Sequence, residues 1–142
     1  MKKIIFVCTG NTCRSPMAEV IGAEIWRGKA QVCSRGLCSY GSPMSENSKK
    51  ALENLGFKPT EHLSTPLTLN DLGDCDLVLT MTEQHKRLIK SQAGELGDKV
   101  FTLGEYSGIS GDIPDPYMQS QEVYDRCCEK ILSCIKAIDI RE

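Results

Sequence analysis

A continuous apolar run near the start of the chain constrains the fold most. Residues 4–7, Ile-Ile-Phe-Val, contain no polar side chain, and a run of this kind suits a strand that is buried on both faces. Residues 77–79 repeat the signal, and residues 100–103 give a weaker version of it. Because parallel sheets are covered by helices on both faces, these runs predict an α/β fold.

Between the apolar runs, hydrophobic residues recur at helical spacing. Three such patterns are Met17 with Ile21 and Ile25, Ala51 with Leu52 and Leu55, and the weakly amphipathic segment 82–89. The clearest pattern is the last one, formed by Tyr124, Cys127, Cys128, Ile131, Ile135 and Ile138. We expect this C-terminal helix to lay an apolar stripe on the sheet, with its cysteines in the core.

The order of these elements predicts the topology. Residues 31–34 are a poor strand by themselves, but they lie where an alternation of strands and helices requires one. Four strands, each followed by a helix and joined by right-handed crossovers, make a small doubly wound, flavodoxin-like, four-stranded parallel sheet with helices on both faces. With 142 residues and no linker-like stretch, we expect a single domain spanning residues 1–142.

Composition and charge exclude several classes of protein. The chain is 40% hydrophobic and 25% charged, with a formal net charge of -2, which argues against nucleic acid as an obligatory partner. Lys2 and Lys3 precede an apolar run that is too short for a signal peptide, and no segment is long enough to cross a bilayer. We therefore expect a cytoplasmic protein that binds neither nucleic acid nor membranes.

The eight cysteines do not form the pattern of a metal site. No Cys-x-x-Cys pair occurs, so a structural zinc site is not expected, and most thiols should be small buried hydrophobes. Cys33, Cys38 and Cys75 have no partner that the sequence assigns. His62 and His85 lack metal-ligand spacing and are expected to be structural or solvated. The sequence predicts no metal and no organic cofactor.

The turn after the first apolar run is the place where this fold binds ligands. It reads Cys-Thr-Gly-Asn-Thr-Cys-Arg-Ser-Pro from Cys8 to Pro16, and we expect Ser15 to be the N-cap of the following helix, with Pro16 at the first helical position. Backbone N–H groups at a helix N-terminus favour a tetrahedral oxyanion. Gly10 and Asn11 are the residues that tolerate the tight backbone of such a loop.

Three side chains of this loop suit phosphoryl transfer. We expect the thiol of Cys8, placed in this positive field, to be a nucleophilic thiolate. The planar fork of Arg14 matches two phosphate oxygens, and the hydroxyl of Ser15 can donate to the thiolate and make it a better leaving group. The spacing Cys-x5-Arg alone is a weak signal, and Cys8 as a core residue beside a solvated Arg14 is the alternative. The position of the Cys-x5-Arg pattern directly after a buried strand strengthens the catalytic interpretation.

The loop from Cys8 to Ser15 resembles the signature of the low-molecular-weight protein tyrosine phosphatases, and Asp115-Pro116-Tyr117 resembles their general-acid loop. Less specific similarities extend over nearly the whole chain, at Ser34, Gly36, Gly41, Pro43, His62, Leu67 and residues 76–81. The resemblance implies that Cys8 attacks phosphorus and that Asp115 first protonates the leaving group and then activates water. It also implies a phosphate-binding loop formed by Thr9, Gly10, Asn11, Thr12, Cys13, Arg14 and Ser15.

The segment around Asp115 also permits other interpretations. An Asp before Pro is common in turns, and from the residues alone a turn role and a catalytic role are equally plausible. Asp112 matches no motif position and is expected to be a solvated loop charge. Tyr117 can stack on a planar substrate group at the pocket mouth or be an ordinary, partly buried residue. Residues 118–120 depart from the small glycines that are usual there in the bacterial family members.

Thr12 bears on the substrate. Many tyrosine phosphatases of this family carry Ile or Leu at this position, whereas the protein-arginine phosphatases of Gram-positive bacteria carry Thr, and the loop resembles theirs. An apolar side chain suits a phenyl ring, while a hydroxyl can hydrogen-bond a phosphoguanidinium group or the attacking water. We therefore expect phosphorylated protein as the partner, phosphoarginine as the favoured substrate and inorganic phosphate as the product. A protein-tyrosine phosphatase with the same mechanism is the alternative, in which Thr12 is only a loop residue.

Two other functions and one form of regulation remain open. Arsenate reductases of this fold need two further cysteines close together in the third strand and the loop that follows it. Only Cys75 lies in this region, and residues 80–98 contain no cysteine. A phosphate-binding module without turnover would not need both Cys8 and Asp115. Cys13 is close enough in sequence to form a reversible, protective disulfide with Cys8, although a packing role for this thiol is equally plausible.

Overall fold

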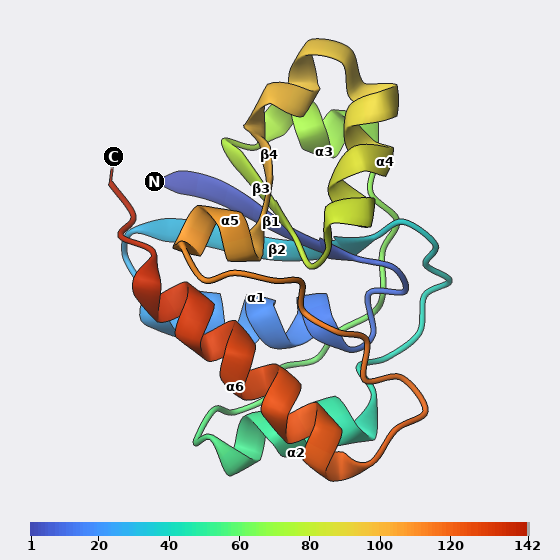
Figure 1. The fold of residues 1–142 in the computed structure, drawn as a ribbon, viewed down its shortest axis with the longest axis vertical. Coiled ribbons are helices and arrows are strands. Elements are labelled where there is room, and N and C mark those ends of the chain that lie inside the picture. The colour runs from blue at the N-terminus through green and yellow to red at the C-terminus, as the bar shows by residue number, and fades with distance from the viewer. Residues whose placement is uncertain (142) are drawn as a thin grey trace.

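The computed structural model describes residues 1–141 as a four-stranded sheet with helices on both faces (Figure 1). The strands are β1 (Lys2–Cys8), β2 (Ala30–Gly36), β3 (Leu77–Thr80) and β4 (Val100–Thr102). The helices are α1 (Arg14–Ile25), α2 (Glu46–Asn54), α3 (Leu69–Asp74), α4 (Glu83–Ala93), α5 (Leu103–Ser107) and α6 (Gln121–Ala137), together with the 3-10 helix η1 (Gly94–Lys99). Neighbouring strands pair in parallel in the order β2-β1-β3-β4. The predicted doubly wound sheet is confirmed.

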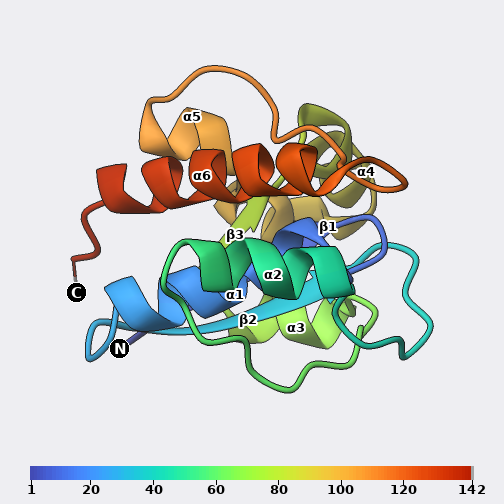
Figure 2. The same cartoon turned by 90° about the horizontal axis from the view of Figure 1, so that it is seen from below.

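Both faces of β1 are buried, as its apolar run predicts. Ile4 and Phe6 belong to a core shared with α1, α2, α5 and α6. Ile5 and Val7 point to the other face, into a smaller core shared with α3 and α4. Figures 1 and 2 show these two helical layers on opposite sides of the sheet. Residues 4–7 of β1 carry no polar side chain because neither face of the strand meets water there, whereas Lys2 and Lys3 lie at its more exposed start.

The two edge strands explain the weaker sequence signals. β2 pairs only with β1, and Gln31 on it is exposed while Val32 and Cys33 are half-buried, so the strand lacks a continuous apolar run. At the other edge, β4 is shorter than its apolar pattern suggests. Leu103 is the first residue of α5 and not part of the strand. Thr102 caps that helix by accepting a hydrogen bond from the backbone N–H of Glu105, at 3.0 Å.

Helix α6 carries the expected apolar stripe, but the stripe does not lie directly on the sheet. It packs mainly against α1, α2 and α5, because α1 already covers β1 and β2 on that side. The predicted core positions of Cys127 and Cys128 are confirmed, since their side chains are 5% and 0% exposed. Burial raises the pKa of both thiols to about 12, so neither is a reactive thiolate near neutral pH.

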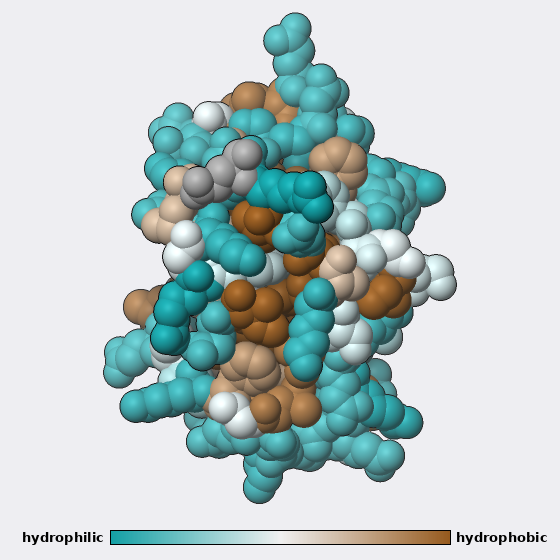
Figure 3. Space-filling view, turned by 90° about the vertical axis from the view of Figure 1, so that its left-hand side faces the viewer, coloured by the Kyte–Doolittle hydropathy of each residue, from teal (hydrophilic) through white to brown (hydrophobic). Residues whose placement is uncertain are grey.

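The two ends of the sheet differ. The carboxyl ends of the four parallel strands lie at one edge of the sheet, and the loop between β1 and α1, at the right-hand side of Figure 1, follows the first of them. Figure 3 views the opposite end, where both chain termini lie, and shows apolar side chains gathered at the centre among hydrophilic ones. Within residues 1–141, no helix has the length and apolar character that a membrane span requires.

Candidate active site

The loop between β1 and α1 is held in shape by Asn11. This residue adopts a left-handed backbone, with φ of 57°, and is completely buried. Its Oδ1 accepts the backbone N–H of Thr65 at 3.0 Å, and its carbonyl accepts a hydrogen bond from Nε2 of His62 at 2.6 Å. Gly10 has no positive φ, and a Cβ there would meet only Thr12 Oγ1, at 3.7 Å. The conformational tolerance expected of both residues is therefore needed only at Asn11.

The hydroxyl of Ser15 contacts the sulfur of Cys8 and does not cap helix α1. α1 begins at Arg14, and its N-cap position is occupied by Cys13, which makes no side-chain capping bond. The prediction that Ser15 is the N-cap is therefore wrong, because its hydroxyl is used elsewhere. Asn11 Nδ2 donates to Ser15 Oγ at 2.8 Å, and this oxygen lies 2.9 Å from Cys8 Sγ. Since the amide nitrogen of Asn11 can only donate, the hydroxyl proton of Ser15 is left for the sulfur, where it stabilises a thiolate.

Arg14 connects the loop to the segment that contains Asp115. Its side chain is buried at 4% exposure. Nη1 donates to the backbone carbonyl of Ile113 at 2.9 Å, and Nη2 lies 3.8 Å from Asp115 Oδ2. A buried guanidinium is costly unless it is paired. These two contacts hold a fixed positive charge directly beside the carboxylate.

Asp115 faces the loop between β1 and α1 from a turn in which the next residues, Tyr117 and Met118, are exposed to solvent. The Asp115 side chain is 55% exposed, and its Oδ1 accepts the backbone N–H of Tyr117 at 3.1 Å. Tyr117 and Met118 are 65% and 84% exposed. Met118 has a φ of 63°, a conformation that favours glycine, so the backbone keeps a glycine-like turn although the side chain has changed. Ser120 caps α6 by accepting the backbone N–H of Val123 at 3.4 Å.

The other two loop residues have different surroundings. Thr12 is half-buried, and its carbonyl accepts the backbone N–H of Ser45 at 2.9 Å. Cys13 is 7% exposed, and its sulfur lies 3.6 Å from both Ser45 Oγ and Tyr124 OH. All eight cysteines, Cys8 and Cys13 among them, are free thiols in this structure.

The predicted site residues gather around one pocket of about 200 Å³. Its walls are formed by Cys8, Thr9, Gly10, Thr12, Cys13, Arg14, Asp115 and Tyr117. Asn11 and Ser15 are buried behind this wall and support it. Asp112 lies outside the pocket, where its Oδ1 accepts the backbone N–H of Glu83 at 3.0 Å. Within residues 1–141, no group of three or more His, Cys, Asp or Glu side chains could hold a metal ion.

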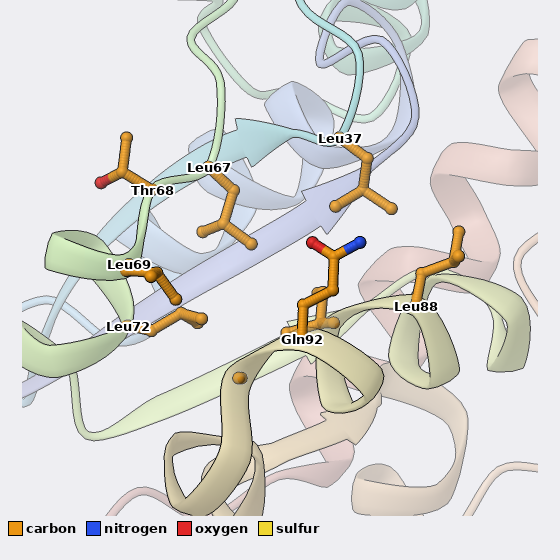
Figure 4. A pocket seen from close by; sticks show the side chains of 9 residues that line it. Leu37, Leu67, Thr68, Leu69, Leu72, Leu88 and Gln92 are labelled. Atoms are coloured by element: carbon orange, nitrogen blue, oxygen red, sulfur yellow. The ribbon is translucent and has the colours of Figure 1, made fainter.

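A second hollow, lined largely by leucines, lies between α3 and α4 (Figure 4). It is lined by Leu37, Leu67, Thr68, Leu69, Leu72, Leu88, Ile89, Gln92 and Ala93. This set contains no thiol, imidazole, carboxylate or other ionisable group. The pocket around Cys8 combines a thiol, a guanidinium and a carboxylate, and it is therefore the candidate active site.

Sequence reasoning missed the contacts of both histidines with the loop. His62 bonds to the carbonyl of Asn11, and His85 Nε2 lies 2.9 Å from Thr9 Oγ1. These contacts cannot be predicted from metal-ligand spacing or from any other local sequence pattern. The available signal was topological: His85 follows the third strand, and the carboxyl ends of neighbouring parallel strands meet at the same edge of the sheet.

A nucleophilic cysteine at the end of β1, a buried arginine six residues later and a carboxylate facing both define the class of cysteine-dependent phosphatases. The model of the low molecular weight phosphotyrosine protein phosphatase family matches residues 3–138. The chain belongs to this family, as its sequence predicts.

Individual relatives divide between two substrates. The chain is 42% identical over 139 residues to a protein-arginine-phosphatase from Bacillus subtilis, covering 95% of this chain and 93% of the relative. It is 39% identical over 140 residues to the low molecular weight protein-tyrosine-phosphatase PtpB of Staphylococcus epidermidis, covering 98% of each. A solved structure of the YwlE arginine phosphatase, a cysteine-to-serine mutant with a phosphorylated active site serine, has a TM-score of 0.87 and 39% identity, covering 95% of this chain and 91% of that one.

Proposed function

We propose that this chain hydrolyses phosphoarginine in proteins, through a phosphocysteine formed on Cys8. The observation that carries the proposal is the single pocket in which Cys8, Arg14 and Asp115 meet Thr12. These groups supply the nucleophile, the positive charge, the acid and a hydroxyl for specificity. The substrate is a phosphorylated protein, and the products are the unmodified arginine side chain and inorganic phosphate.

In the first step, Cys8 Sγ attacks phosphorus while the bond from phosphorus to the guanidinium nitrogen breaks. Arg14 and the backbone N–H groups of the loop bind the phosphoryl oxygens and neutralise their growing charge. Asp115, protonated for this step, gives its proton to the departing nitrogen. Ser15 Oγ lies 2.9 Å from the attacking sulfur and can donate a hydrogen bond to it.

In the second step, the carboxylate of Asp115 accepts a proton from a water molecule that attacks the phosphocysteine. The sulfur leaves as a thiolate, which the hydroxyl of Ser15 stabilises, and inorganic phosphate is released. The mutant YwlE structure with a phosphorylated serine at its active site supports the same covalent route here. No metal or organic cofactor takes part in either step, since Arg14 and the backbone supply the positive charge.

The preference for phosphoarginine rests on Thr12. Thr12 lines the pocket together with Cys8, and its Oγ1 lies 3.7 Å from Cys13 Sγ. In this pocket a hydroxyl can hydrogen-bond a guanidinium nitrogen or the attacking water. The arginine phosphatase from Bacillus subtilis, at 42% identity, supports this assignment. The exposed ring of Tyr117 at the pocket mouth can stack on a planar guanidinium or on a phenyl ring, so it does not decide between the substrates.

Matched phosphoarginine and phosphotyrosine peptides test the assignment. We expect a higher kcat/KM for the phosphoarginine peptide, and we expect Thr12→Ile to move the ratio toward phosphotyrosine. A wild-type preference for phosphotyrosine would make the chain a tyrosine phosphatase with the same mechanism. A preference that Thr12→Ile leaves unchanged would reduce Thr12 to a loop residue.

We also propose a cytoplasmic location and a protective role for Cys13. Eight free thiols fit a reducing compartment. A reactive thiolate at Cys8 is exposed to irreversible oxidation, and Cys13 on the same pocket wall is the thiol that can trap it as a reversible disulfide.

A further inference from the structure

His85 has a position that the proposed chemistry does not use. It is the third residue of α4, and its side chain is only 6% exposed. Its backbone N–H donates to Thr82 Oγ1 at 3.2 Å, and its ring atom Nε2 lies 2.9 Å from Thr9 Oγ1. Thr9 directly follows the nucleophile, so this contact ties α4 to the loop that holds the phosphoryl group.

The other ring nitrogen determines which atom carries the proton. Nδ1 is buried and has no hydrogen-bond partner among residues 1–141. A buried N–H without an acceptor is rarer and more costly than a buried lone pair without a donor. The neutral ring therefore carries its proton on Nε2 and donates it to Thr9 Oγ1.

The charges around the ring favour this neutral form. The charged groups that face His85 are Arg14 from the phosphate loop and two carboxylates, Asp112 and Asp115, from the segment before α6. Burial and then the positive charge of Arg14 lower the pKa of His85 to about 4, although the two carboxylates act in the opposite direction. The ring is thus a neutral donor at neutral pH.

We infer that His85 is a positioning residue of this active site, which holds Thr9 and thereby the phosphate-binding loop through the bond from Nε2. Thr9 is fixed at two points, because its carbonyl also accepts the backbone N–H of Cys38 at 2.9 Å. Thr9 itself lines the pocket beside Cys8. The inference rests on the proposed function in that it assigns this pocket to a phosphoryl group.

Two amide substitutions separate positioning from simple packing. His85→Gln places an amide N–H where Nε2 lies and can still reach Thr9, whereas His85→Asn places its amide near Nδ1 and cannot. The probe is inorganic phosphate, and its Kd is measured by calorimetry without turnover. We expect His85→Asn to raise this Kd about tenfold, which is the upper end of the effect of one neutral hydrogen bond, and His85→Gln to stay within about threefold of the wild type.

A second variant makes the test independent of the stability of the buried site. Thr9→Val removes the accepting hydroxyl at an exposed residue, and we expect a similar, about tenfold rise in the phosphate Kd. The double variant of Thr9→Val with His85→Asn should bind phosphate with the same Kd as either single variant, because both substitutions remove the same hydrogen bond. Equal phosphate affinity in His85→Asn and the wild type, or additive losses in the double variant, would overturn the inference. Absence of turnover in the wild type, with these binding effects intact, would instead refute the proposed function.

Discussion

Lowering the pH should destabilise the protein through His85. Burial and the positive charge of Arg14 lower the pKa of this ring from 6.5 to about 4, against the opposite effect of Asp112 and Asp115. In the unfolded chain the ring titrates near 6.5. Between these values the unfolded chain binds a proton that the folded chain does not, so the free energy of unfolding falls as the pH falls.

The magnitude follows from the gap between the two pKa values. A gap from 6.5 to about 4 corresponds to roughly 3 kcal/mol when the pH lies below both values. Between pH 7.5 and pH 5, His85 should remove about 2 kcal/mol of unfolding free energy. This is a large share of the roughly 5–15 kcal/mol by which small domains are stable.

Urea titrations at these two pH values, under reducing conditions, measure the effect. His85→Gln has no ring to titrate, so its loss of unfolding free energy on acidification should be smaller by about 2 kcal/mol. Carboxylates and His62 are common to both proteins and cancel in the comparison. Equal losses in the two proteins would refute the reasoning, because the fold would then not hold His85 in its neutral form.

Three further predictions concern the active site. Asp115→Asn should lower kcat/KM on a phosphopeptide by roughly 10²–10⁴ and much less on p-nitrophenyl phosphate, whose leaving group needs no proton in the first step, as steady-state kinetics will reveal. Gly36→Ala should cost about 1–3 kcal/mol of unfolding free energy, because a Cβ there would lie only 2.9 Å from the carbonyl oxygen of Thr9 in the phosphate loop. Gly73→Ala is the control, since a Cβ there would meet nothing within 4 Å. Equal urea midpoints for the two variants would contradict this prediction. Peroxide followed by peptide mapping should find a disulfide between Cys8 and Cys13, and a sulfinic acid at Cys8 without that disulfide would reject the protective role.

The sequence predicted those parts of the site that are local in the chain. Cys8 and Arg14 lie at the two ends of one loop, and a buried strand before that loop is enough to place both at the edge of a parallel sheet. Asp115 needed the family resemblance, because an Asp-Pro turn alone does not reveal that it faces Arg14 at 3.8 Å. The fold followed in the same way, from apolar runs that are clear in the central strands and faint in the edge strand β2.

The remaining features depend on contacts between distant residues. Ser15 was expected to cap α1 because the local pattern fits, but the approach of Cys8 Sγ and Asn11 Nδ2 gives its hydroxyl another role. His85 lies 76 residues from Thr9, and no spacing rule connects the two. Such contacts follow from the register of β1 and β3 and from the position of α4, which only the folded chain defines.

The central claim is that catalysis passes through a phosphoryl group on Cys8. Rapid acid quenching during turnover of a phosphoarginine protein, followed by mass mapping, tests it most directly. The account predicts a phosphoryl group on Cys8, at no more than one per chain, and no turnover in Cys8→Ser. Turnover that proceeds without any phosphorylated enzyme, or that survives in Cys8→Ser, would contradict the account.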